Sequence, residues 1–330
     1  MIKLAIDLLG SDLGEEELIE GVKSFLKDHD DIILHLFGNE ELLKKHFNTD
    51  KIVIHNVSKF VPMEVGALQF LRMKDTSMYQ AISSTMELEL DGVVSAGSTG
   101  GFLTGATLII KNIPGVHRAG FCAPFLTLKE GKQVAILDIG ASNINTPEDL
   151  LCFGRLGNVY AKKMWNIEKP SVYLLNNGVE KGKGPDEVKN AYTLFEQCEN
   201  INFKGNIEAR EVMSGEADVV VTSGFPGNIY LKASEGMAKN MSLLLNNAFR
   251  HSLMTKISYL LVRKQIKRMK EIMNYKKVGG ALTLGLNKVV VKAHGNSDAY
   301  SFYHAIDLAY RMASVKMTEA IKKEFEWKTN

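Results

Sequence analysis

Short, nearly continuous apolar runs rich in β-branched residues alternate along this chain with longer amphipathic stretches. Runs of this kind predict strands that are buried on both faces, and the stretches between them predict helices, such as one over residues 77–90. The alternation is typical of a mostly parallel sheet that is covered by helices on both sides. The predicted strands are residues 2–6, 32–37, 51–57, 92–95, 133–139, 171–175, 218–222 and 288–293.

Size and composition fit one large domain of this class. The chain has 330 residues, 45% of them apolar, and no low-complexity linker divides it, which predicts a single catalytic domain over residues 1–330. The formal net charge of +2 gives no nucleic-acid signature. Three cysteines without a paired spacing fit a reducing compartment. Since no signal peptide or bilayer-spanning apolar run is found, we expect a cytoplasmic protein.

Glycine-containing loops follow six of the predicted strands. They carry Ser, Thr, Asn and Asp, and several of them lead into a predicted helix, whose free N–H groups favour an anion. In a parallel sheet the carboxyl ends of the strands share one edge, so we expect a single site there for a small anion such as phosphate. The loops are residues 7–12, 95–101, 138–143, 176–184, 223–228 and 294–298.

Familiar nucleotide and metal motifs do not match these loops. The stretch from Gly178 to Lys183 is similar to a P-loop, but its spacing is short, and Gly184 stands where Ser or Thr would meet Mg²⁺. No G-x-G-x-x-G follows the first predicted strand, and the sequence has no H-E-x-x-H or paired-cysteine motif. The sequence therefore predicts an enzyme without cofactor or metal.

These loops, in this order, resemble the bacterial phosphate acyltransferases of phospholipid synthesis. The resemblance runs from Asp7 to about Arg311, although Ser98 and Pro185 stand where the family usually has Asn. The matching blocks include Ser95-Ala96-Gly97, Leu137-Asp138-Ile139-Gly140-Ala141, Asn202-Phe203-Lys204-Gly205-Asn206, Gly224-Phe225 with Gly227-Asn228, Gly279-Gly280-Ala281 and Lys292-Ala293-His294-Gly295.

The resemblance implies a fold, a reaction and partners. The fold would be a three-layer α/β/α sandwich with a mostly parallel Rossmann-like sheet, of the isocitrate/isopropylmalate dehydrogenase type, plus a protruding basic amphipathic helical element. The reaction would convert fatty acyl-acyl carrier protein and orthophosphate to acyl phosphate and free carrier protein. Acyl phosphate would then feed a membrane glycerol-3-phosphate acyltransferase in phospholipid synthesis, and the enzyme would be a homodimer.

Attack of phosphate on a thioester needs little acid–base work, because phosphate is already an anion and a thiolate leaves readily. The site must instead bring two anionic partners together and stabilise an oxyanion with N–H groups, amides and cations. Lys183, between two glycines, is the first candidate to neutralise this charge, the alternative being a solvated loop lysine. Asn228 either caps the helix after its loop or donates its carboxamide to the substrate.

His294 and Ser297 lie at the end of the last predicted strand, where a histidine is often a structural group. Asp138 is expected to order loops rather than to perform chemistry. The candidate catalytic residues are therefore Lys183, Asn228 and His294, and the candidate phosphate and substrate contacts are Ser98, Thr99, Gly100, Asn143, Ser223 and Ser297.

A basic amphipathic segment without acidic residues runs from Gly236 to Lys270. Apolar residues such as Ile257, Leu260 and Leu261 recur in it at helical spacing, which predicts a helical element over residues 236–277. The element could contact an anionic membrane, dock the acidic carrier protein or form a dimer interface. The family resemblance favours membrane contact, and hence a cytoplasmic enzyme that is peripherally associated with the membrane.

Other functions share parts of the pattern. A short-chain phosphate acetyl- or butyryltransferase that uses acyl-CoA follows the same chemistry, but the basic helix favours a long-chain donor. A decarboxylating dehydrogenase would need a nucleotide and usually a divalent metal held by an aspartate cluster, which the sequence does not display. A membrane-docked scaffold would explain the helix but not the loops.

Overall fold

The computed structural model describes residues 1–272 and 280–326, and one sheet of 11 strands runs through this part of the chain. The strands are β1 (Ile2–Asp7), β2 (Ile32–Gly38), β3 (Ile52–Asn56), β4 (Gly92–Ser95), β5 (Gly120–Leu126), β6 (Gln133–Leu137), β7 (Ser171–Asn176), β8 (Asn202–Glu208), β9 (Val219–Val221), β10 (Ala281–Leu284) and β11 (Val289–Lys292). Their order in the sheet is β3-β2-β1-β4-β11-β10-β5-β6-β9-β7-β8.

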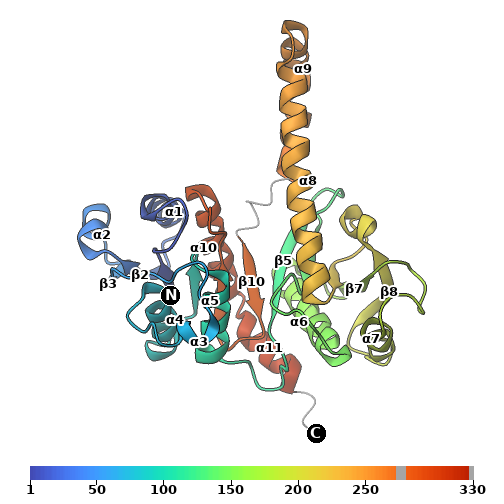
Figure 1. The fold of residues 1–330 in the computed structure, drawn as a ribbon, viewed down its shortest axis with the longest axis horizontal. Coiled ribbons are helices and arrows are strands. Elements are labelled where there is room, and N and C mark those ends of the chain that lie inside the picture. The colour runs from blue at the N-terminus through green and yellow to red at the C-terminus, as the bar shows by residue number, and fades with distance from the viewer. Residues whose placement is uncertain (273–279, 327–330) are drawn as a thin grey trace.

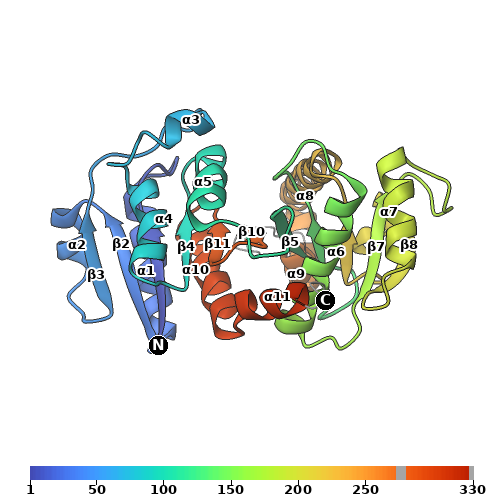
Figure 2. The ribbon, with the colours of Figure 1, turned by 90° about the horizontal axis from the view of Figure 1, so that it is seen from below.

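The sheet consists of two parallel blocks that run in opposite directions. Strands β3, β2, β1, β4 and β11 pair in parallel, and so do β6, β9, β7 and β8. Antiparallel pairing of β10 with β11 and β5, and of β5 with β6, joins the blocks, which lie on either side of this junction in Figure 2. The mostly parallel sheet is confirmed, but the expectation of one shared edge is wrong, because the strand-end loops form two groups.

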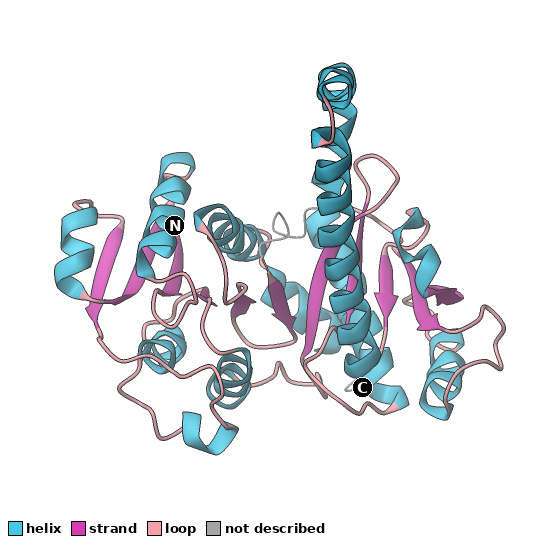
Figure 3. Ribbon diagram, turned by 45° about the horizontal axis from the view of Figure 1, so that its top comes forward, coloured by secondary structure: helices cyan, strands magenta, loops and turns pink. Residues whose placement is uncertain are grey.

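Helices cover both faces of the sheet (Figures 1 and 3), which confirms the three-layer prediction. A large core cluster joins both blocks on the face that carries α1, α6, α7, α10 and α11, while smaller clusters lie on the opposite face of each block. The helices of the body are α1 (Glu15–Asp28), α2 (Glu40–His46), α3 (Ala67–Phe70), α4 (Ser77–Glu87), α5 (Thr99–Gly105), the π-helix η1 (Ala106–Ile110), α6 (Pro147–Trp165), α7 (Asp186–Glu196), the 3₁₀ helix η2 (Ala209–Ser214), α10 (Ala299–Ser314) and α11 (Met317–Glu326).

The strands predicted from the sequence do not include β5 and β10 at the junction or β8 at one edge of the sheet. Strand β5 contains Gly120 and Pro124, which interrupt a strand pattern, since proline cannot donate to the ladder. Within β5, strand β10 pairs with residues 120–122, and Pro124 lies past the end of this pairing. Strand β8 is an edge strand with Gly205 in the left-handed region of the backbone. Gly120 and Pro124 therefore made β5, one of the two strands of the junction, difficult to predict from the sequence.

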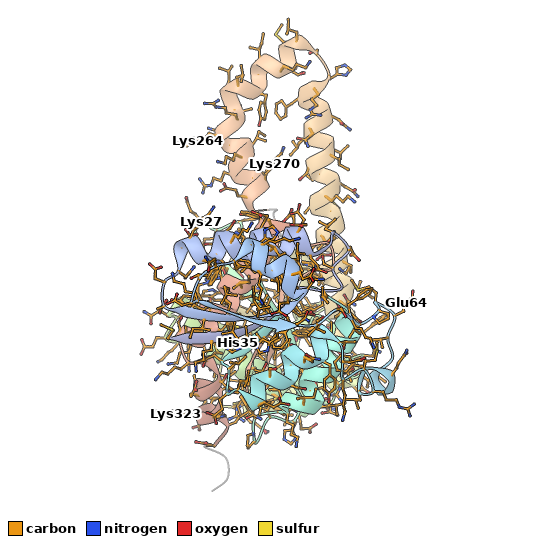
Figure 4. All side chains as sticks on the ribbon, turned by 90° about the vertical axis from the view of Figure 1, so that its left-hand side faces the viewer. Lys27, His35, Glu64, Lys264, Lys270 and Lys323 are labelled. Carbon is orange, nitrogen blue, oxygen red and sulfur yellow. The ribbon has the colours of Figure 1, made fainter. Side chains whose placement is uncertain are left out.

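Two long helices leave the body as a hairpin that we call the arm. They are α8 (Gly224–Arg250) and α9 (Leu253–Ile272), and the arm projects beyond the rest of the fold in Figures 1 and 4. The helical element predicted over residues 236–277 is confirmed over residues 236–250 and 253–272, and its first helix begins earlier than predicted. Residues 273–277 lie outside the described part of the chain. Lys270, labelled in Figure 4, donates from Nζ to Asn246 Oδ1 at 2.6 Å and ties the two helices together.

Candidate active site

The N-terminus of α8 lies directly on the loop that follows β6. A Cβ atom on Gly224 would be 2.0 Å from the carbonyl oxygen of Ser142, and one on Gly227 would be 1.9 Å from that of Asp138. Any side chain at either position would collide with backbone, so glycine is required for this close approach. The pair of glycines in the sequence thus places the start of a long helix, with its free N–H groups, against a strand-end loop.

Asp138 organises the β6 loop, as the sequence predicts. Its carboxylate accepts hydrogen bonds from the backbone N–H groups of Phe121, Gly140, Ala141 and Ser142 at 2.8–3.1 Å, and from the Ser142 hydroxyl at 2.8 Å. Burial raises the pKa of Asp138 above its ordinary value, while these hydrogen bonds act in the opposite direction. The carboxylate is fully used in holding the loop.

Asn145 connects this loop to the start of α8. Its Oδ1 accepts from the Ser223 hydroxyl at 2.8 Å and from the N–H of Gly224 at 3.1 Å, and it lies 2.9 Å from the Ser142 hydroxyl, whose one hydrogen it shares with Asp138. Its Nδ2 is buried and makes no hydrogen bond within the part of the chain that the structure describes. The predicted ligand contact Ser223 therefore gives its hydroxyl hydrogen to the loop, and Asn145 is a site residue that the sequence analysis missed.

A cavity of about 800 Å³ opens between the carboxyl ends of β7 and β9, the start of α7 and the first turns of α8. The predicted residues Asn143 and Ser223 line it, together with Asn176 and Asn177, which were not predicted individually. The other lining residues are Leu150, Leu174, Leu175, Gly184, Pro185, Glu187, Val188, Ala209, Val221, Thr222, Phe225, Pro226, Ile229, Tyr230 and Ala233. Amide and hydroxyl groups thus meet an otherwise mostly apolar wall.

Lys183 lies on the exposed β7 loop, between Asn177 and Gly184, which both line the cavity. Asn176 donates from Nδ2 to the Lys183 carbonyl oxygen at 3.0 Å and so pins the loop to the end of its strand. Asn228 instead lies over the β6 loop, with its Cβ and Cγ 3.2 Å from the place where a Cβ on Gly140 would be. Ser223 is the N-cap residue of α8, so the N-cap alternative for Asn228 is wrong.

The predicted residues of the first block form a separate, closed group. Ser98 is fully buried at the N-cap of α5, where it accepts from Gly101 N–H at 3.3 Å and donates to the Met63 carbonyl at 3.0 Å. Thr99 and Gly100 follow it on the exposed side of the first turn. The Ser297 hydroxyl is buried without a hydrogen-bond partner in the described residues. Of these residues, Ser98 thus joins the start of α5 to the segment that contains Met63.

A row of buried polar residues ends the strands of this first group. Asp7, Ser95 and Lys292 are the last residues of β1, β4 and β11 and are paired in register. The Ser95 hydroxyl donates to Asp7 Oδ2 at 2.7 Å, and the Lys292 ammonium donates to the Ala293 carbonyl oxygen. Burial lowers the pKa of Lys292 to about 8, against the opposing charges of Asp7 and Asp12. The sequence does not predict this row, because Lys292 is the last residue of an otherwise apolar strand and a lysine there is usually exposed.

The two groups of loops adjoin through α8 and α5. His294 Nε2 of the first group lies 4.0 Å from Oε1 of Glu235, which is on α8. Residues Leu103 of α5 and Thr107 of η1 line a second cavity, of about 510 Å³, together with the β6 loop residues 141–144. Asn143 lines both cavities. No cluster of three or more His, Cys, Asp or Glu side chains suited to a metal occurs within residues 1–272 and 280–326.

Fold and loops together define an α/β protein of the phosphotransacylase fold. A phosphotransacetylase from Streptococcus pyogenes superposes with a TM-score of 0.61 and 16% identity, covering 95% of this chain and 94% of that chain. A 4-hydroxythreonine-4-phosphate dehydrogenase from Klebsiella pneumoniae gives a TM-score of 0.55 and 12% identity, covering 95% and 100%. At these identities the similarity shows the fold, which transferases and dehydrogenases share.

The chain itself belongs to the family described as fatty acid synthesis protein, whose sequence profile matches residues 2–320. It is 37% identical to a phosphate acyltransferase from Clostridium botulinum over 334 residues, covering 99% of this chain and 100% of that protein. A phosphate acyltransferase from Staphylococcus aureus is also 37% identical over 324 residues, with 98% of each chain covered. The family that the loop blocks indicate is thereby confirmed.

Proposed function

We propose that this chain is a phosphate acyltransferase that uses fatty acyl-acyl carrier protein and orthophosphate. The observation that carries the proposal is its similarity, over nearly the full length, to proteins named phosphate acyltransferase. A phosphate oxygen forms a bond to the thioester carbonyl carbon, and the carbon–sulfur bond breaks with its electron pair on sulfur. The proton that hydrogen phosphate gives up passes to the sulfur, so the products are acyl phosphate and the free thiol of the carrier protein.

The site residues would act mainly by charge and orientation. The start of α8 and the amides of Asn143 and Asn228 would hold phosphate and the carbonyl oxygen, and the Lys183 ammonium would neutralise the charge that develops. His294 would approach from the first group of loops. The expected contacts of the buried Ser98 and Ser297 would then be indirect, whereas Ser223 lines the cavity and Thr99 and Gly100 are exposed.

The test is to incubate the protein with a long-chain acyl thioester of acyl carrier protein and phosphate, without added nucleotide or metal, and to trap acyl phosphate with hydroxylamine. We expect trapped hydroxamate that depends on both substrates. A parallel reaction with acetyl- or butyryl-CoA tests the short-chain alternative. Product with the short-chain CoA thioester alone would replace the long-chain assignment, and no product with either donor would refute the proposal.

We propose that the arm brings the enzyme to the cytoplasmic face of an anionic membrane and pairs two copies of the chain. Near its tip, Leu253, Met254 and Leu261 are 74–81% exposed, beside Lys256 and a run of basic residues on α9. Exposed apolar residues next to basic ones suit the surface of an anionic bilayer. Within the described residues, no helix is long and apolar enough to cross a membrane.

Closer to the body, Met237, Met241 and Leu244 are exposed along α8 and would pair with a second copy in a homodimer. Peripheral attachment would deliver acyl phosphate to a membrane glycerol-3-phosphate acyltransferase. Flotation with anionic vesicles tests the membrane contact: wild type should float, and Leu260→Glu should float much less. Equal flotation of the two proteins would argue against apolar insertion of the tip.

A further inference from the structure

The cavity beside α8 has two chemically different parts. Asn143, Asn176, Asn177 and Ser223 form a polar rim, and the remaining wall is built mainly from aliphatic and aromatic side chains. We call the apolar part the acyl groove. Its walls are Leu150, Leu174, Leu175, Val188, Val221, Phe225, Ile229, Tyr230, Ala209 and Ala233.

We infer that the acyl groove binds the hydrocarbon chain of the thioester substrate and that its length and width set the chain-length preference. This inference rests on the proposed function and deepens it, because it assigns the apolar half of the substrate to named residues. The thioester carbonyl would then lie at the polar rim, next to the start of α8 and the loop of Lys183.

Exposure of apolar side chains supports this assignment. Phe225 and Ile229 are 59% and 54% exposed on the first turns of α8, although they stand next to the fully buried Leu150 and Val221 at the bottom of the groove. Large apolar residues that remain exposed beside a concave site usually mark a place where another apolar surface binds. An alkyl chain in the groove would remove both side chains from water.

The polar linker that joins the acyl group to the carrier protein is a poorer fit for the same groove. The linker between the carrier protein and the thioester contains amide groups. Burying an amide without a hydrogen-bond partner is unfavourable. The amide side chains that line the cavity, those of Asn143, Asn176 and Asn177, lie at or just after the carboxyl ends of β6 and β7, and Ser223 follows β9. Thr222, Glu187 and Tyr230 add polar groups to a wall that is otherwise mostly apolar. The mostly apolar walls therefore favour binding of the hydrocarbon chain inside the acyl groove, with the polar linker of the carrier protein outside it.

Two alanines allow the groove to be narrowed without disturbing the core. Ala233 on α8 and Ala209 at the start of η2 both line the groove, and both are exposed. Ala233→Trp and Ala209→Trp would each place an indole in the groove from a different wall. Asn190→Trp is the control, because Asn190 is exposed on α7 and does not line the cavity.

The experiment compares kcat/KM for butyryl, dodecanoyl and hexadecanoyl thioesters of acyl carrier protein, with circular dichroism as the check on folding. For each groove variant, the ratio of hexadecanoyl to butyryl kcat/KM should fall about tenfold relative to wild type, which corresponds to about 1.4 kcal/mol. The control should keep the wild-type ratio, and the KM for phosphate should stay close to the wild-type value.

A ratio that stays unchanged in both folded groove variants would overturn the inference, whether or not their overall rates fall. A variant that does not fold is replaced by the other one, since they act from different walls. Absence of product from wild type with every chain length would instead refute the proposed function, so the two failures can be told apart.

Discussion

The two groups of strand-end loops are built from similar residues but have opposite character. In the first group, the Ser98 hydroxyl both donates and accepts a hydrogen bond, and the strand-end residues Asp7, Ser95 and Lys292 are buried. In the second group, Asn143, Lys183 and Asn228 are exposed, and Asn143 lines the cavity of about 800 Å³. The first group buries Ser98 and its row of strand-end polar residues but exposes Thr99 and Gly100, whereas the second group borders an open cavity. This difference supports the proposal that the second group offers the main binding surface.

The difference also shows how glycine is used in each group. In the second group, Gly224 and Gly227 bring a helix start onto loop backbone and so create one wall of the cavity. In the first group, Gly97 lies against the Met78 side chain, with a Cβ position 2.6 Å from its Cε. Gly224 and Gly227 thus help to form a cavity wall, whereas Gly97 allows tight packing against a side chain.

Gly227→Ala should have the largest effect on stability, because the new methyl group would overlap the Asp138 carbonyl. We expect a loss of about 3 kcal/mol or more in the free energy of unfolding, together with the loss of acyl phosphate formation. Gly236→Ala is the matched control, since nothing lies within 4 Å of its Cβ position on the same helix. It should gain about 0.5–1 kcal/mol in chemical denaturation. Equal stability of the two variants would contradict the packing described at α8.

The buried lysine of the first group should make stability depend on pH. Its pKa is lowered from 10.5 to about 8 in the folded protein, so between these values the unfolded chain holds a proton that the folded protein has released. The free energy of unfolding should therefore rise with pH in this window, by roughly 3 kcal/mol for this group. Lys292→Met should lose that part of the rise in denaturant titrations from pH 8 to 10.5. Parallel curves for both proteins would show that Lys292 is not held in this way.

Ser98 and Asn143 provide the sharpest comparison between the groups, with the smallest effects. Ser98→Ala removes the N-cap bond of α5 and should cost about 1 kcal/mol of stability, with a smaller change in kcat/KM. Asn143→Ala should lower kcat/KM about tenfold or more, with a stability change below about 0.5 kcal/mol. Thermal unfolding and initial rates on the same samples measure both quantities. The opposite result would mean that the closed group, rather than the open one, contacts the substrate.

Much of this architecture could be predicted from the chain. Apolar runs located most strands, and the polar residues that follow them marked the loops. The division of the loops into two groups could not be predicted, because it depends on the antiparallel pairing of β5 and β10, and Gly120 and Pro124 obscured β5. Asn145 and Lys292 were missed for a different reason, since their roles depend on burial and on partners far away in sequence.

In the proposed reaction, the second group of loops transfers the acyl chain to phosphate, with Lys183 supplying the charge. Lys181 lies on the same loop, and its ammonium is held in an ion pair with Glu196 at 2.5 Å, so it gives a matched control. The most direct measurement is hydroxylamine-trapped acyl phosphate formed from long-chain acyl-acyl carrier protein and phosphate by wild type, Lys183→Ala and Lys181→Ala. We predict a loss of about 100-fold or more for Lys183→Ala and less than about twofold for Lys181→Ala. Near-normal turnover by a folded Lys183→Ala protein would contradict the account.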